Sequence, residues 1–165
     1  MPIKRRKEFE LLQETIVTEV KLGGKKIFFV TVYCSPSQSS EAFALFTDKL
    51  QSVINRLKTE KPHALILIGD FNCRSSQWWY GDIEQQEGND VDELIETNNL
   101  NQLIDEPTNI RGDSMSCIDL IITDQPAFVV ETGVNPSLDD LCQHQIIIGK
   151  LNIASPFPPP YKRTV

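Results

Sequence analysis

The feature that most constrains this chain is a short apolar run that stops abruptly at an acid. Residues 64–68 read "ALILI", and "GDFN" follows directly at residues 69–72. An uninterrupted apolar run bounded by Pro62 and Gly69 is typical of a buried strand. The run therefore places Asp70 and Asn72 at a strand end. Taken alone, this favours a turn over a catalytic site, because Asp and Asn are common turn residues.

The rest of the chain alternates strands with helices. Residues 14–21 alternate polar and apolar, and Gly23-Gly24 suits the hairpin turn that returns the chain along residues 26–33. Apolar residues at three- and four-residue steps predict a helix over 41–58, and acids at its start favour a short helix over 90–99. Further strands are predicted at 101–105, 116–123, 127–132 and 144–153, with a turn at 124–126 and a loop at 133–142. This order predicts an α/β layered sandwich around a mixed sheet.

Composition narrows the functional classes. The net charge of −7 argues against a nucleic-acid binder, because phosphate contacts need basic surface. An enzyme that binds phosphate through a divalent metal ion tolerates acidic residues at its active site. The net charge therefore does not exclude a metal-dependent enzyme that acts on nucleic acid. The four cysteines are too scattered for a structural zinc site. No apolar run is long enough to cross a bilayer and no signal peptide is evident, so we expect an intracellular protein without a membrane segment.

Several predicted strands end at, contain or begin with a residue whose side chain can take part in catalysis. Tyr33 closes one strand, Asp119 interrupts an apolar stretch where it needs a partner, and His144 opens the last strand. A carboxylate bonded to an imidazole fixes its tautomer and raises its pKa. If the strands lie side by side, these three residues converge with Asp70 and Asn72 at one rim, an arrangement that suits phosphodiester hydrolysis. The structural alternatives are a strand-end aromatic for Tyr33 and a core histidine for His144.

Other polar residues are interpreted as structural. Arg74 and Arg111 are taken as isolated surface charges, and Trp78 and Trp79 as a loop that packs against the core. The acidic run over residues 82–96 is interpreted as a solvated face.

Several stretches resemble one family in the same order along the chain. They are "YCSPSQ", "GDFNCRSSQW", "IDEPTNI", "SCIDLIITDQP" and "GVNPSLDDLCQHQI". These resemble the endonuclease domains of non-LTR (LINE-type) retrotransposons, within the DNase I-like endonuclease/exonuclease/phosphatase superfamily. The resemblance implies a layered β-sandwich flanked by helices and a DNA-nicking activity that leaves a 3′-hydroxyl. The tail "PPPYKR" resembles the linker to a reverse transcriptase domain, and a DNA substrate makes a nuclear location possible.

The resemblance also implies site roles. Asp70 would position or deprotonate the attacking water, and Asn72 would orient that water and the scissile phosphate. His144, held by Asp119, would stabilise phosphoryl charge or transfer a proton, and Tyr33 would contact the phosphate or the leaving oxygen. A Mg²⁺ ion, with Asp70 and Asn72 among its ligands, would neutralise charge on the transferred group.

Two departures from the family pattern bear on activity. Gln143 stands where the family commonly has an acid, which predicts weaker metal binding. The superfamily's opening strands carry an Asn and then a Glu as principal Mg²⁺ ligands, and we expect these to lie upstream of Met1. The expectation is therefore a partial domain over residues 1–153 that lacks its N-terminal portion, followed by a proline-rich tail at 154–165. The competing interpretations are an inactive remnant of that domain and a phosphatase of the same fold.

Overall fold

The structure is a computed structural model that describes residues 3–12, 14–139 and 142–153. The tail predicted at 154–165 lies outside these residues. Among the described residues, no helix is long and apolar enough to cross a membrane.

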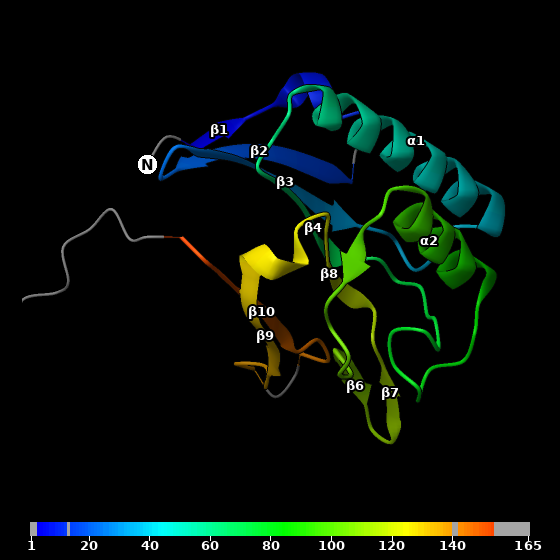
Figure 1. The fold of residues 1–165 in the computed structure, drawn as a ribbon. Coiled ribbons are helices and arrows are strands. Elements are labelled where there is room, and N and C mark those ends of the chain that lie inside the picture. Colours follow the sequence, from blue (N-terminus) through cyan, green and yellow to red (C-terminus); the bar gives the residue numbers. More distant parts are fainter. Residues whose placement is uncertain (1–2, 13, 140–141, 154–165) are drawn as a thin grey trace, which may run out of the picture.

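A curled six-stranded sheet forms the centre of the fold (Figure 1). Its strands lie in the order β1 (Ile3–Arg5), β2 (Thr15–Leu22), β3 (Lys25–Tyr33), β4 (Ala64–Asp70), β8 (Asp119–Thr123) and β5 (Asn101–Gln102). Only β3 and β4 pair in parallel, and the helix that the sequence predicts between them makes that crossover. Gly23 and Gly24, with φ of 53° and 77°, form the predicted hairpin turn between β2 and β3. The mixed sheet follows from these connections.

Two layers cover the sheet. Helices α1 (Ser40–Thr59) and α2 (Gln86–Thr97) pack over one face, while the ribbon of β9 (Val129–Asn135) and β10 (Ile146–Leu151) lies on the other side (Figure 1). Ser39 caps α1 by accepting a hydrogen bond from the Ala42 N–H, and the predicted apolar stripe of α1 is buried. Ile147 and Val134 pack against the core from the ribbon. The predicted α/β layered architecture is confirmed.

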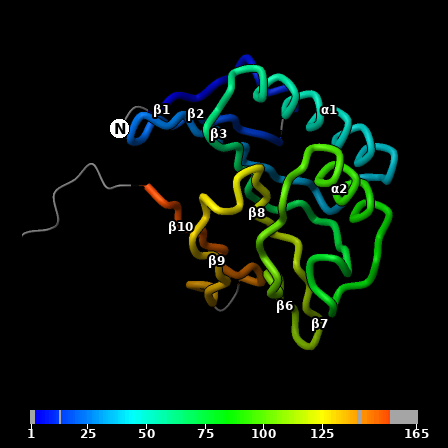
Figure 2. The backbone as a smooth tube through the Cα atoms, viewed as in Figure 1, coloured from blue at the N-terminus to red at the C-terminus, as the bar shows by residue number. Residues whose placement is uncertain are grey.

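The sequence patterns missed a second hairpin. β6 (Asn109–Arg111) and β7 (Ser114–Ser116) form a two-stranded unit that projects away from the central sheet (Figure 2). The strand predicted over 116–123 is therefore interrupted, and β8 begins at Asp119. The 101–105 strand shortens to the two residues of β5. Short 3₁₀ turns at Lys7–Phe9 and Pro126–Phe128, and the edge strand β1, were also not predicted.

Part of the acidic run at 82–96 is buried, contrary to the solvated-face interpretation. Asp82 is 8% exposed and accepts a hydrogen bond from the Cys117 N–H. Asp92 accepts hydrogen bonds from the Ser75 hydroxyl at 2.6 Å and the Trp78 indole N–H at 2.7 Å. These carboxylates tie the loop after β4 to α2 and β7. Trp78 packs into the core, as the sequence predicts.

Candidate active site

Three of the predicted residues lie in one row across neighbouring strands. The parallel register of β3 and β4 sets Tyr33 beside Asp70, and the antiparallel register of β4 and β8 sets Asp70 opposite Asp119. Two carboxylates thus meet at the end of the sheet where β4 stops and β8 starts. Directly opposed like charges repel unless another group lies between or beside them.

The "GDFN" stretch is a turn, and the turn holds the acid in place. Asn72 has φ of 48°, a left-handed conformation that Asn tolerates better than most residues. Its backbone N–H donates to Oδ1 of Asp70 at 2.9 Å, and its Nδ2 donates to Oδ2 at 2.9 Å and to the Cys34 carbonyl at 2.7 Å. The structural and chemical interpretations of this motif are therefore compatible, because the turn fixes the Asp70 carboxylate at the sheet edge.

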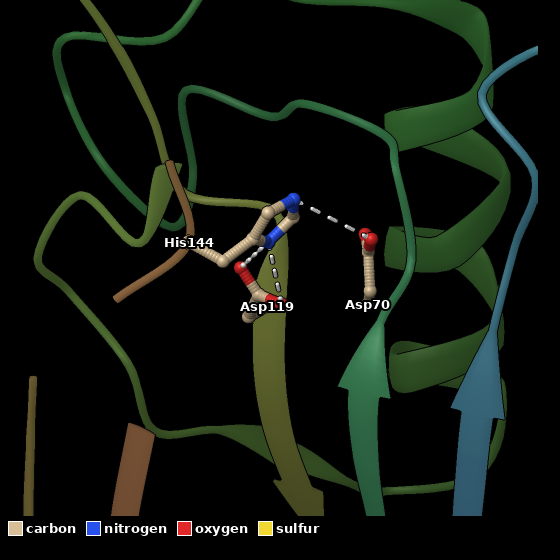
Figure 3. A group of neighbouring side chains, drawn as sticks. All are labelled: Asp70, Asp119 and His144. Carbon is tan, nitrogen blue, oxygen red and sulfur yellow. Dashed lines mark hydrogen bonds and ion pairs between the residues drawn. The ribbon is translucent and has the colours of Figure 1, made fainter. Parts of the chain in front are cut away.

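His144 lies between the two carboxylates (Figure 3). Its Nδ1 is 3.0 Å and 3.2 Å from the two oxygens of Asp119, and its Nε2 is 4.0 Å from Oδ2 of Asp70. In the tautomer that carries its hydrogen on Nδ1, the ring donates this hydrogen to Asp119. The imidazole thus presents Nε2 toward Asp70, and Asp119 orients the ring.

Burial, together with the charge of Asp119, raises the pKa of Asp70 to about 6. Hydrogen bonds from Asn72 and the proximity of His144 oppose the shift. A carboxyl group with this pKa is poised to exchange protons near neutral pH.

The shift in Asp70 predicts a pH-dependent stability. Because its folded pKa of about 6 exceeds the ordinary value of 3.8 for an aspartic acid, the stabilisation from the protonated group is present below pH 3.8 and lost as pH rises through about 6. Discounted for the solvent that still reaches the carboxylate, this loss is about 1 kcal/mol. Asp70→Asn removes it. In thermal unfolding with EDTA, we expect the Tm of the variant relative to the parent to rise by roughly 2–4 °C between pH 4 and pH 7.5.

The exposed Asp48→Asn on α1 is the matched control, and its Tm difference should stay constant over this range. A constant difference for Asp70→Asn as well would show that Asp70 titrates normally.

The donors at the sheet edge suit a divalent cation bound through oxygen. Ligand atoms of Asp70, Asp119 and His144 lie within 4.8 Å of one another. Nδ1 of His144 is already bonded to Asp119, which leaves the Asp70 carboxylate as the more available ligand. Nδ2 of Asn72 makes that residue's side-chain hydrogen bonds, so its amide oxygen is also available. Carboxylate and amide oxygens are ligands that Mg²⁺ prefers.

Thr108 is a positioning residue that the sequence motifs contained but to which no role was assigned. Its buried hydroxyl accepts hydrogen bonds from the backbone N–H groups of Ile118 at 3.0 Å and Asp119 at 2.8 Å. Its carbonyl accepts the Gln145 N–H at 2.7 Å. Asn109, the next residue, forms a β-bridge with His144. Thr108 therefore fixes the start of β8 and the segment that carries His144 relative to each other.

Four of the five predicted site residues line one open cleft of about 540 Å³, and Asp119 lies behind His144 outside its lining. Its walls include Tyr33, Asp70, Asn72, Asn109, Arg111 and His144. Tyr33 is 53% exposed, and its hydroxyl forms no hydrogen bond within the described residues. Two clefts of similar volume, about 610 Å³ and 600 Å³, lie along α2 and contain no histidine. The chemistry therefore concentrates in the cleft at the end of β4.

The sequence model of a family described as endonuclease-reverse transcriptase matches residues 27–148. The chain belongs to this endonuclease-reverse transcriptase family. The matched range contains all five predicted site residues. A search of curated proteins gave no match.

Solved structures show the same fold as this member of the endonuclease-reverse transcriptase family. The endonuclease domain of TRAS1, a telomere-specific non-LTR retrotransposon, superposes with a TM-score of 0.77 at 18% identity, covering 93% of this chain and 70% of that one. The 3′ phosphatase NExo from Neisseria gives 0.59 at 14% identity, covering 92% and 71%. The AP endonuclease LMAP from Leishmania major gives 0.63 at 14% identity, covering 81% and 53%. The predicted endonuclease/exonuclease/phosphatase fold is confirmed.

Proposed function

We propose that this chain is a metal-dependent endonuclease domain that hydrolyses a phosphodiester bond of DNA and leaves a nick with a 3′-hydroxyl. The observation that carries the proposal is the position of His144, bonded to Asp119 and facing Asp70 across an open cleft, in a member of the endonuclease-reverse transcriptase family.

Asp70 acts on the attacking water in this proposal. Its pKa of about 6 leaves it ionised at neutral pH yet basic enough to accept a proton from the water. The hydrogen bonds from Asn72 hold the carboxylate in one orientation, and the free amide oxygen of Asn72 orients the same water. A fixed geometry of this kind removes much of the entropic cost of bringing water to phosphorus.

His144 acts on the phosphoryl group. With Nδ1 held by Asp119, the ring keeps Nε2 at the cleft, where a protonated imidazole donates a hydrogen bond to a phosphoryl oxygen. Tyr33, which lines the same cleft beside Asp70, contacts the phosphate or the leaving 3′-oxygen through its hydroxyl.

Asp70 and Asn72 would hold a Mg²⁺ ion, which would supply charge neutralisation at the phosphoryl oxygens. The divalent charge would also offset the repulsion between the Asp70 and Asp119 carboxylates. The side-chain oxygen of Gln143 accepts a hydrogen bond from Arg111, so it would not serve as a metal ligand in this arrangement, and the weaker metal binding expected from Gln143 stays a prediction.

A supercoiled plasmid provides the test. With Mg²⁺ we expect conversion to the open-circular form, no conversion with EDTA, and nicks that a DNA polymerase extends without prior phosphatase treatment. Release of inorganic phosphate from 3′-phosphorylated oligonucleotides without nicking would favour the phosphatase alternative. Neither activity in a folded protein would identify the chain as an inactive remnant.

The proposed function carries two further expectations. In this family the domain precedes a reverse transcriptase, for which a nicked 3′-hydroxyl is a suitable primer. A genomic DNA substrate also implies a nuclear location, which fluorescence microscopy of a tagged chain would test.

A further inference from the structure

The cleft-facing side of the β6–β7 hairpin is entirely polar. Side chains alternate along a strand, so Asn109 and Arg111 share one face with their cross-strand partners Ser116 and Ser114. All four residues line the cleft that contains His144. The opposite face carries Ile110 and Met115, which are 38% and 45% exposed. The hairpin therefore extends the active-site cleft with a wall of hydrogen-bonding groups.

Arg111 is held on this wall by Gln143. Its Nε donates to Oε1 of Gln143 at 2.8 Å, and the backbone carbonyl of Gln143 accepts the N–H of Ile110 at 2.9 Å. Gln143 directly precedes His144, so the guanidinium is fixed relative to the imidazole. Within the described residues, the terminal guanidinium nitrogens of Arg111 make no hydrogen bond or ion pair. They remain available to a ligand in the cleft.

Because Gln143 is neutral, its hydrogen bond with Arg111 does not offset the positive charge of the guanidinium. The other guanidinium at this cleft, Arg74, lies 3.9 Å from the buried carboxylate of Asp82, which offsets its charge. Gln143 contributes an amide, so the Arg111–Gln143 pair carries a net charge of +1 and still presents N–H donors. A carboxylate at position 143 would form an ion pair and cancel that charge. The interpretation of Arg111 as an isolated surface charge is therefore incomplete.

We infer that Arg111, oriented by Gln143, binds a backbone phosphate of the polynucleotide next to the one that is cleaved. This inference rests on the proposed function. Arg111 lies two residues beyond Asn109, the bridge partner of His144, which is roughly 7 Å along the strand. In a chain of net charge −7 with two carboxylates at the reacting centre, this unpaired cation supplies the attraction that a polyanion needs. Substrates with a single phosphate do not reach it.

The test is equilibrium binding of a fluorescein-labelled DNA duplex, followed by anisotropy in EDTA at several NaCl concentrations. Arg111→Gln is expected to weaken binding roughly 5- to 20-fold at low salt and to reduce the slope of log K against log salt by about 0.9, the value for one lost phosphate contact. Arg111→Lys should keep the slope. Gln143→Glu should weaken binding in the same direction as Arg111→Gln, because it pairs the guanidinium.

Lys49→Gln on the exposed side of α1 is the matched control, since it removes one charge far from the cleft and should leave affinity and slope within about twofold. The Tm of Arg111→Gln should match that of the parent, which would show that a loss of affinity does not come from unfolding. Binding without nicking by the parent chain would refute the proposed function and leave the Arg111 site standing. Equal affinity and slope in Arg111→Gln and Lys49→Gln, or no DNA binding by the parent, would overturn the inference.

Discussion

His144→Ala is expected to lower the rate of plasmid nicking by roughly 10³-fold while the protein stays folded. The imidazole contacts Asp119 and also faces Asp70, at 3.0 Å and 4.0 Å. Its removal deletes the hydrogen-bond donor to the phosphoryl oxygen. The rate is measured as the initial formation of open-circular plasmid under single-turnover conditions with Mg²⁺.

His63→Ala is the matched control for this variant. His63 lies at the start of β4, at the end opposite Asp70, and its ring packs edge-on against Phe128 at 4.9 Å. Its loss should leave nicking within about twofold. Asp119→Asn keeps the volume of the carboxylate but no longer fixes the imidazole tautomer, so we expect a loss approaching that of His144→Ala. A His144→Ala variant that retains a tenth or more of the parent rate would remove the imidazole from the reaction.

The residues proposed for the site could be selected from the sequence because the ends of strands can be located there. Periodicity locates strands, and Asp70 and Tyr33 fall at the ends of two that pair in parallel. The pairing of β4 with β8, which opposes Asp70 and Asp119, is not encoded in periodicity. That contact joins residues far apart in the chain, and the predicted convergence depended on the assumption that the strands lie side by side.

Features that depend on tertiary context were missed. Thr108 has no periodic signature, and its role arises only because its hydroxyl meets two backbone N–H groups of the strand that starts at Asp119. Asp82 and Asp92 belong to an acidic stretch that composition assigns to solvent, yet they satisfy buried N–H groups of Cys117 and Trp78. The partners of such carboxylates are set by how the loops fold over the sheet, so no local pattern identifies them.

The β6–β7 hairpin is another feature that local sequence patterns do not identify. Its strands are three residues each, too short for a period-two pattern to stand out from a loop. The tight turn at Gly112, with φ of 59°, was not interpreted as a hairpin signal. Missing this hairpin led to the interpretation of Arg111 as an isolated charge.

Gly69 is a backbone position where the close packing of the central strands bears directly on the active site. It precedes Asp70, has φ of 144°, and lies where β4 pairs with β3 on one side and β8 on the other. A Cβ at this position would lie 2.0 Å from the carbonyl oxygen of Val32 and 2.9 Å from its carbonyl carbon. Both contacts are with backbone, which a rotamer change cannot relieve. Any side chain therefore has to separate β3 from β4 next to Asp70.

Gly69→Ala is accordingly expected to destabilise the protein by at least about 3 kcal/mol, from the left-handed backbone and the clash together. In thermal unfolding this corresponds to a fall in Tm of roughly 6–12 °C. Nicking at a temperature where the variant remains folded should fall as well, because Asp70 shifts relative to Tyr33 and Asp119. Gly133→Ala in β9 is the matched control, since a Cβ there meets no atom within 4 Å and its Tm should hold. Equal Tm values for the two alanine variants would mean that β3 and β4 approach less closely at Gly69 than the structure shows, and the row of Tyr33, Asp70 and Asp119 would lose its support.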